Sequence, residues 1–178
     1  MNAEAPRPSL QVAVIGGAVC SAEEVRFAEE VGRRIAQGGA VLICGGTTGV
    51  MEAACRGARL AGGMTVGVLP GKMIESGNPW LSARLPTGMG DGRNWLVAAG
   101  AHAVVAIGGG LGTLSEIALA LRVGAPVIGL GTWEAIDAQG NRLPVVRVQS
   151  AEEAAAEALT AAARRQVNET GEGTHRRA

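Results

Sequence analysis

The stretch AVVAIGGGLGTLSE, residues 103–116, contains the pattern that decides the fold. Five consecutive apolar residues, 103–107, predict a buried strand. Three glycines and a fourth at position 112 follow at once and predict a tight turn, and residues 114–123 then predict a helix. A strand that passes through a glycine-rich turn into a helix is the basic unit of an α/β protein.

The same unit recurs along the chain. Residues 10–15 (LQVAVI) predict a strand that stops at Gly16-Gly17, before a helix capped by Ser21. Residues 41–44 predict a second strand, followed by a turn at 45–49 and a helix over 50–61. Further strands are expected at 64–69, 126–130 and 143–148, and further helices at 93–100 and 150–165. Because the strands are continuously apolar, helices should cover both faces of a parallel, doubly wound α/β/α sheet.

The length and the distribution of polar residues indicate one domain. A chain of 178 residues fits a single core, here expected over residues 10–165. Residues 1–9 are polar and predict a flexible N-terminus, and the polar residues 166–178 predict a disordered tail. Residues 70–92 are rich in proline and glycine and predict a long loop, which in a compact domain is usually functional or mobile.

Composition disfavours several classes of protein. Basic and acidic residues number 16 each and aromatic residues make up 2%, so neither a nucleic acid nor a membrane surface is an expected partner. No apolar leader or membrane span is evident, which predicts a cytoplasmic protein. Three cysteines at irregular spacing match neither a disulfide framework nor a zinc pattern, and no metal site is expected.

The glycine-rich turns predict an anion site. In open α/β sheets, ligands bind beyond the carboxyl ends of the strands, where glycines let backbone N–H groups approach a phosphate at a helix N-terminus. The alternative is that these glycines only make tight turns between strands and helices. The predicted binding residues are Gly16, Gly17, Gly45, Gly46, Thr47, Gly49, Gly108, Gly109, Gly110, Gly112 and Thr113.

Two charged residues are expected at the same mouth. Arg93 opens a predicted helix and can grip a phosphate through two guanidinium N–H groups. Glu116 follows Thr113 by three positions and is interpreted as a first-turn residue; a carboxylate there repels phosphate but suits sugar hydroxyls or a developing sugar cation. Taken alone, Arg93 can instead be a solvated loop residue, and Glu116 can be an acid favoured by the helix dipole.

These motifs resemble the LOG-like family, once misannotated as lysine decarboxylases. Residues 45–51 (GGTTGVM) are similar to its GGGxxGLM segment, and residues 108–116 (GGGLGTLSE) to its PGGxGTxxE signature. The resemblance implies a Rossmann-like fold and a homodimer or larger homo-oligomer. In hydrolytic members, nucleoside 5′-monophosphates lose their base without a cofactor, and Arg93 and Glu116 would be the catalytic pair.

A neighbouring branch of the superfamily is the better match. Residues 88–94 (GMGDGRN) and the GGGxGTxSE form are similar to molybdenum-cofactor carriers and to uncharacterised bacterial proteins related to the DNA-processing protein DprA. Asn94 stands where the hydrolases have Lys, and Gly108 where they have Pro. This resemblance favours a binding protein for a nucleotide or for the molybdenum cofactor. The phosphoribohydrolase remains the alternative, because Arg93 and Glu116 are both present.

Overall fold

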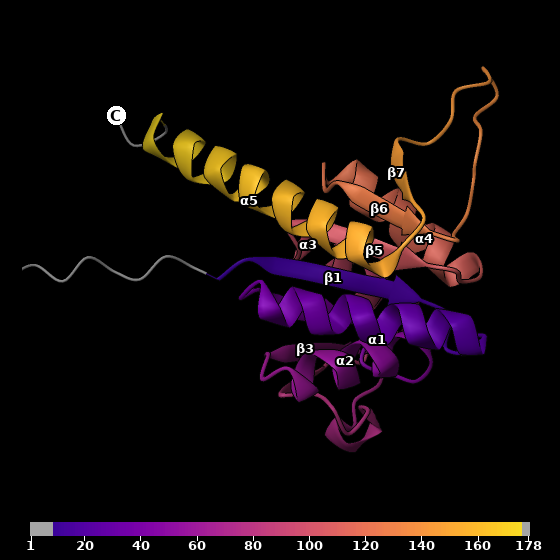
Figure 1. The fold of residues 1–178 in the computed structure, drawn as a ribbon, viewed down its shortest axis with the longest axis vertical. Helices are drawn as coiled ribbons and strands as arrows, with labels where there is room; N and C mark the ends of the chain where they lie inside the picture. The colour runs from indigo at the N-terminus through magenta and orange to yellow at the C-terminus, as the bar shows by residue number, and fades with distance from the viewer. Residues whose placement is uncertain (1–8, 176–178) are drawn as a thin grey trace, which may run out of the picture.

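The computed structural model describes residues 9–175 and shows one parallel seven-stranded sheet, ordered β4-β3-β2-β1-β5-β6-β7 (Figure 1). The predicted parallel α/β architecture is therefore confirmed. The strands are β1 (Gln11–Gly16), β2 (Val41–Cys44), β3 (Thr65–Leu69), β4 (Ala83–Pro86), β5 (Ala103–Ile107), β6 (Val127–Leu130) and β7 (Val145–Val148).

Within residues 9–175, five α-helices and two short 3₁₀ helices accompany the strands, and the last of them, α5, follows β7. The α-helices are α1 (Ala22–Gln37), α2 (Val50–Leu60), α3 (Asn94–Ala99), α4 (Leu111–Arg122) and α5 (Ala151–His175). The 3₁₀ helices are η1 (Ile74–Ser76) and η2 (Gly90–Arg93). Residues of α1, α2 and α5 share one buried cluster with the strands, and residues of α3 and α4 share a second. The two clusters place the helices in two outer layers.

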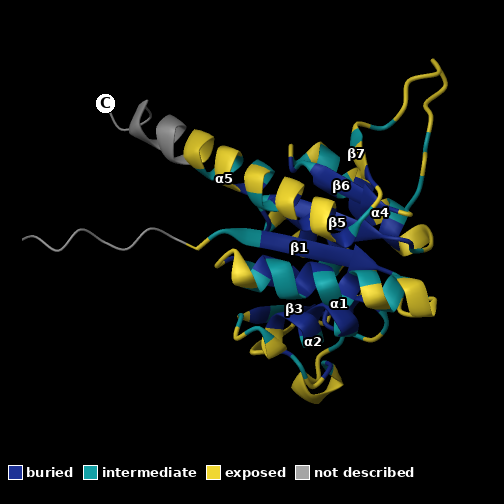
Figure 2. Ribbon diagram, in the orientation of Figure 1, coloured by how far each residue is buried: buried dark blue, intermediate teal, exposed yellow. Residues whose placement is uncertain are grey.

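The core consists mainly of small aliphatic side chains, as the scarcity of aromatic residues requires. The central strand β1 is buried along almost its whole length, whereas the outward sides of α1 and α5 are exposed (Figure 2). Small core residues allow helices and strands to approach closely, so the fold depends on shape complementarity rather than on large hydrophobic anchors.

The strand order indicates where a ligand-binding crevice should lie in the sheet. β1 pairs with β2 on one side and with β5 on the other, so the chain winds outward in both directions from β1 and β5. Ligands of doubly wound proteins bind at this switch point, beyond the carboxyl ends of the strands. The turns that follow β1 and β5 are the two that begin at Gly17 and Gly108.

Two glycines allow α1 and α2 to pack backbone against backbone. A Cβ atom at Gly57 would overlap the carbonyl oxygen of Glu29, and one at Gly32 would overlap that of Ala54. Gly57→Ala is therefore expected to lower the free energy of unfolding by about 1–3 kcal/mol, because the helices must separate. Urea unfolding measures this difference.

A matched control for this prediction is Gly112→Ala in α4. A Cβ atom there meets nothing within 4 Å, so this change is expected to leave stability unchanged or to raise it by up to about 1 kcal/mol. Equal effects of the two substitutions would contradict the assigned role of Gly57.

Helix boundaries differ from the sequence-based expectation in two places. Helix α4 begins at Leu111 rather than Leu114, inside the glycine-rich run, because the N–H of Leu114 donates to the carbonyl oxygen of Gly110 at 3.1 Å and closes the first turn there. Helix α5 runs to His175, whereas a disordered tail was expected from residue 166. An ion pair between Arg165 and Glu169, 2.8 Å long, bridges one turn of this extension. Residues 1–8 of the N-terminal segment predicted over 1–9, and residues 176–178 of the predicted tail, lie outside the described residues.

The predicted loop over residues 70–92 contains structure of its own. It holds η1, the edge strand β4 and most of η2. The edge strand pairs with β3, so this segment lies along one side of the sheet and ends at Arg93. The loop therefore carries Arg93 to the carboxyl end of the sheet.

The cysteines are free thiols. Cys44 and Cys55 are buried with their sulfur atoms 3.4 Å apart, and Cys20 is half-buried. Among residues 9–169, whose side chains the structure describes, no three His, Cys, Asp or Glu side chains are grouped so that they could hold a metal ion. Within the same residues, no helix combines the length and the apolar character needed to cross a bilayer.

Candidate functional site

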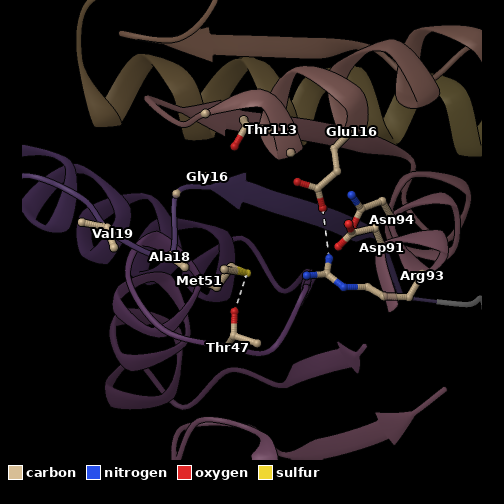
Figure 3. Close-up of a pocket in the computed structure, with 13 residues that line it drawn as sticks. Gly16, Ala18, Val19, Thr47, Met51, Asp91, Arg93, Asn94, Thr113 and Glu116 are labelled. Atoms are coloured by element: carbon tan, nitrogen blue, oxygen red, sulfur yellow. Dashed lines mark hydrogen bonds and ion pairs between the residues drawn. The ribbon is translucent and has the colours of Figure 1, made fainter. Parts of the chain in front are cut away.

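A cavity of about 370 Å³ opens at the switch point between β1 and β5. The loop after β1 forms one wall with Gly16 and Gly17, and the start of α4 forms the opposite wall (Figure 3). Thr47 after β2 and the segment around Arg93 complete the rim. The cavity falls within the size range of small-ligand sites, roughly 300–1,000 Å³.

The start of α4 supplies the first set of donors. Gly110 is the N-cap, and no side chain caps this helix. The N–H groups of the first turn have no intrahelical acceptors and carry the positive end of the helix dipole. The side chain of Thr113, in the same turn, points its hydroxyl group toward the cavity (Figure 3). Together these groups form a site suited to an anion.

Glycines behind the cavity wall make this arrangement possible. Gly109 has a φ of +96°, and a Cβ atom there would overlap the hydroxyl of Thr113. At Gly45, a Cβ atom would overlap the guanidinium of Arg93. Because neither glycine has a Cβ atom, the side chains of Thr113 and Arg93, which can donate to a ligand, have room in these positions.

Arg93 and Glu116 form a direct ion pair in the wall of the cavity. Arg93 ends η2, Glu116 lies in α4, and Nη1 of Arg93 is 3.1 Å from Oε1 of Glu116 (Figure 3). Their side chains are only 11% and 9% exposed, so the pair is largely removed from water. The Nε–H group of Arg93 is buried and has no hydrogen-bond partner among the described residues.

Burial dominates the electrostatics of the carboxyl group. Desolvation raises the pKa of Glu116 to about 7, and the nearby Arg93 guanidinium offsets only part of this rise. At neutral pH, Glu116 therefore divides between a carboxylate paired with Arg93 and a neutral acid. A carboxyl group of this kind can accept or donate a proton under physiological conditions.

The position of Glu116 in its helix differs from the expectation. Because α4 begins at Leu111, Glu116 lies beyond the first turn, and the helix has no acidic residue in its first turn. Stabilisation by the helix dipole therefore does not account for Glu116. Its carboxyl group nevertheless reaches the cavity, because one further turn brings the side chain to the same face as Thr113.

The cavity brings together some of the predicted residues and not others. Those that line it are Gly16, Gly17, Thr47, Arg93, Gly110, Gly112, Thr113 and Glu116. The neighbours of Arg93, Asp91 and Asn94, line it as well. The predicted residues that do not line it are Gly45, Gly46, Gly49, Gly108 and Gly109.

Three apolar lining residues were not predicted. Ala18 and Val19 follow Gly17, and Met51 lies in the first turn of α2. Val19 is 96% exposed, which is unusual for a valine and marks the apolar lip of the cavity. The only sequence signal was proximity to the glycine turns, because a valine or methionine by itself carries no chemical signature.

Two solved structures are similar to this chain over most of its length. The molybdenum cofactor binding protein of Rippkaea orientalis is 34% identical, with a TM-score of 0.71 over 84% of this chain and 93% of that one. The Moco carrier protein of Chlamydomonas reinhardtii is 31% identical, with a TM-score of 0.76 over 88% of this chain and 99% of that one. These similarities extend over most of each protein rather than a shared fragment.

Sequence comparison gives the family. An uncharacterised protein of Archaeoglobus fulgidus is 44% identical over 121 residues, 68% of this chain and 80% of that protein. The model of the SLOG cluster4 family matches residues 9–159, which include every strand and every residue lining the cavity. The chain belongs to the SLOG cluster4 family.

Proposed function

We propose that this protein is a carrier that binds a phosphorylated small molecule, either a nucleotide or a molybdopterin-type cofactor, at the cavity beside α4. The observation that carries the proposal is the convergence of three kinds of donor on one cavity. These are the first-turn N–H groups of α4, the hydroxyl of Thr113 and the guanidinium of Arg93. Charge-assisted hydrogen bonds of this type contribute about 1.5–3 kcal/mol each.

The residues fit the phosphate end of such a ligand. Gly109 keeps the Thr113 hydroxyl in place, and the buried Nε–H of Arg93 lacks an acceptor that a ligand oxygen can supply. None of the lining residues is a cysteine or histidine, so the fit concerns the phosphate and not the molybdenum atom of the cargo. The similarity to the carriers of Rippkaea orientalis and Chlamydomonas reinhardtii supports the cofactor as ligand. We place this function in the cytoplasm.

A phosphoribohydrolase is the second candidate, and the Arg93–Glu116 pair is the observation that favours it. With a phosphate at α4, the ionised Glu116 could bind ribose hydroxyls and stabilise an oxocarbenium-like transition state, while Arg93 orients the substrate. Because the pKa of Glu116 is about 7, the rate of base release by such an enzyme should rise as the pH increases through 7.

One experiment separates the two functions. The purified protein is incubated with AMP, GMP, CMP, isopentenyl-AMP and molybdopterin, thermal unfolding is recorded, and free base is followed by chromatography. Thermal stabilisation without base release supports the carrier. Base release that disappears in Glu116→Ala, with AMP binding retained, establishes the hydrolase instead. If none of these compounds raises the unfolding temperature and no base is released, both functions are wrong.

We also propose that the protein forms a homodimer through the uncovered half of the sheet. An apolar groove of about 390 Å³ runs over β1–β4 beside α3. Its lining contains no charged residue: Gln11, Val41, Ile43, Val66, Val68, Leu85, Thr87, Leu96 and Gly100. Parallel sheets are normally covered on both faces. Helix α3 borders the groove with Trp95 and Leu96 41% and 39% exposed, so a second copy can offer a complementary helix in a two-fold arrangement.

Leu96→Glu is therefore expected to convert the dimer into a monomer, because it places a charge in the apolar interface. Light scattering at a fixed concentration measures the mass of each variant. Leu60→Glu is the matched control, since Leu60 is 69% exposed at the end of α2 and is absent from the groove. A monomeric wild-type protein would refute the homodimer.

A further inference from the structure

Two carbonyl groups of the glycine-rich turn are held by residues that follow β6. The hydroxyl of Thr132 donates to the carbonyl oxygen of Gly108 at 2.6 Å. The indole Nε1–H of Trp133 donates to the carbonyl oxygen of Gly110 at 3.0 Å. Strand β6 pairs with β5, so both donors come from the strand beside the turn. Trp133 is absent from the lining of the cavity, and neither residue belongs to the motifs found in the sequence.

These bonds bear on the cavity because a peptide unit is planar. Within one unit the C=O and N–H groups point in opposite directions. Fixing the carbonyl of Gly108 therefore fixes the N–H of Gly109, and fixing the carbonyl of Gly110 fixes the N–H of Leu111, the first residue of α4. Thr132 and Trp133 thus set the direction of amide groups at the start of the anion site.

The turn itself needs such external support. Gly108 and Gly109 have φ values of +50° and +96°, which glycine adopts freely but among many other conformations. A run of three glycines does not by itself select one arrangement. Hydrogen bonds from a neighbouring, better anchored segment select it, and thereby reduce the conformational entropy that ligand binding would otherwise have to remove.

The supporting segment is anchored in turn. The guanidinium of Arg147, in β7, donates to the carbonyl oxygen of Thr132 at 2.9 Å and also to that of Trp133. The indole ring of Trp133 packs against the core cluster that contains Ile117 of α4. The rest of the connection to β7 projects from the molecule (Figure 1). Only its first residues are therefore tied to the site.

We propose that Thr132 and Trp133 are positioning residues that preorganise the glycine-rich turn for an anionic ligand. This inference rests on the proposed function, because it assumes that the turn binds a phosphate. It adds a requirement that the binding motifs do not contain: two side chains outside the cavity wall orient the turn from which α4 and its first N–H groups begin.

The test compares Thr132→Val with Thr132→Ser, using AMP as the probe. Valine has nearly the shape of threonine but cannot donate, whereas serine keeps the hydroxyl. Thr132→Val is expected to weaken AMP binding about tenfold in calorimetric titration, the effect of losing roughly one hydrogen bond. Thr132→Ser is expected to keep the affinity within about threefold of wild type, because serine retains the hydroxyl donor. Trp133→Phe, which removes the indole donor and part of the ring that packs against the core, should weaken binding by at least a similar factor.

A second readout separates positioning from general destabilisation. In ¹⁵N–¹H spectra of the ligand-free protein, Thr132→Val should shift the amide signals of Gly109 and Leu111 and leave those of β1 unchanged. Equal AMP affinity of Thr132→Val and wild type would overturn the inference while leaving the proposed function intact. Equal losses in the valine and serine variants would also overturn it. A wild-type protein that binds neither AMP nor molybdopterin would overturn the proposed function and, with it, this inference.

Discussion

Gly110→Asp is expected to abolish binding of phosphorylated ligands without destabilising the protein. Gly110 is the N-cap of α4, has a φ of −104°, and a Cβ atom there meets nothing within 4 Å. Asp is among the most favourable N-cap residues, and its carboxylate accepts from the N–H groups of the first turn. Those are the amides proposed to hold the phosphate, so the substitution places a competing anion in the site.

The expected effect is large. At about 4 Å, two like charges near a protein surface repel by roughly 4 kcal/mol, and a blocked charge-assisted bond removes about 1.5–3 kcal/mol more. We therefore expect the binding free energy to weaken by at least about 3 kcal/mol, which lowers the affinity for AMP or molybdopterin more than 100-fold. Calorimetric titration measures the affinity, and urea unfolding should show unchanged stability or a gain of a few tenths of a kcal/mol.

Gly110→Ala and Gly110→Asn are the matched controls. Alanine adds a Cβ atom into open space and should bind ligand nearly as well as wild type. Asparagine can cap the same amides but carries no charge, so an intermediate affinity is expected. If the aspartate and alanine variants bound ligand equally well, the start of α4 would not be the anion site.

The second large effect concerns stability and pH. The pKa of Glu116 is about 7 in the folded protein, against an ordinary value of 4.5, because burial disfavours the carboxylate. Between these two pH values, the folded state holds a proton that the unfolded state has released. The free energy of unfolding should therefore fall as the pH rises from about 5 to about 7 and level off above it. The total contribution of Glu116 is about 3 kcal/mol.

Glu116→Gln isolates this contribution, because glutamine keeps the shape but does not titrate in this range. Urea unfolding of both proteins is measured at half-unit intervals between pH 5 and 8. The difference in unfolding free energy between glutamine variant and wild type should increase with pH up to about 7, whatever other groups titrate. Parallel pH profiles would show that Glu116 is not perturbed and would contradict the buried position of its carboxyl group.

The sequence was sufficient for the fold because its signals are local and repeated. Each run such as residues 103–107, followed by glycines and a helix, specifies a unit that can pack in few other ways. The helix boundaries were predicted less well where the local composition pointed to a turn or a tail. Gly110 and Gly112 predict a turn, so the sequence did not indicate the first turn of α4. The polar residues after Arg165 predict a disordered tail, so the sequence did not indicate the extension of α5. In both places the structure overrides the local preference of single residues.

The candidate site could be predicted only for residues near a glycine motif. Motif spacing identified Thr113, Glu116 and Arg93, although Arg93 reaches the cavity only through the long segment that contains β4. The ion pair between Arg93 and Glu116 was not predicted, since it depends on how that segment returns to the sheet. Trp133 gave no usable signal, because its role arises from tertiary contacts alone.

A crystal structure of the protein with AMP or molybdopterin bound tests the central claim most directly. The account predicts that the ligand's phosphate oxygens lie about 3 Å from the backbone nitrogens of the first turn of α4, from Oγ1 of Thr113 and from the guanidinium of Arg93. A phosphate bound elsewhere, for example beside Arg147 at the cavity beyond β6 and β7, would contradict it.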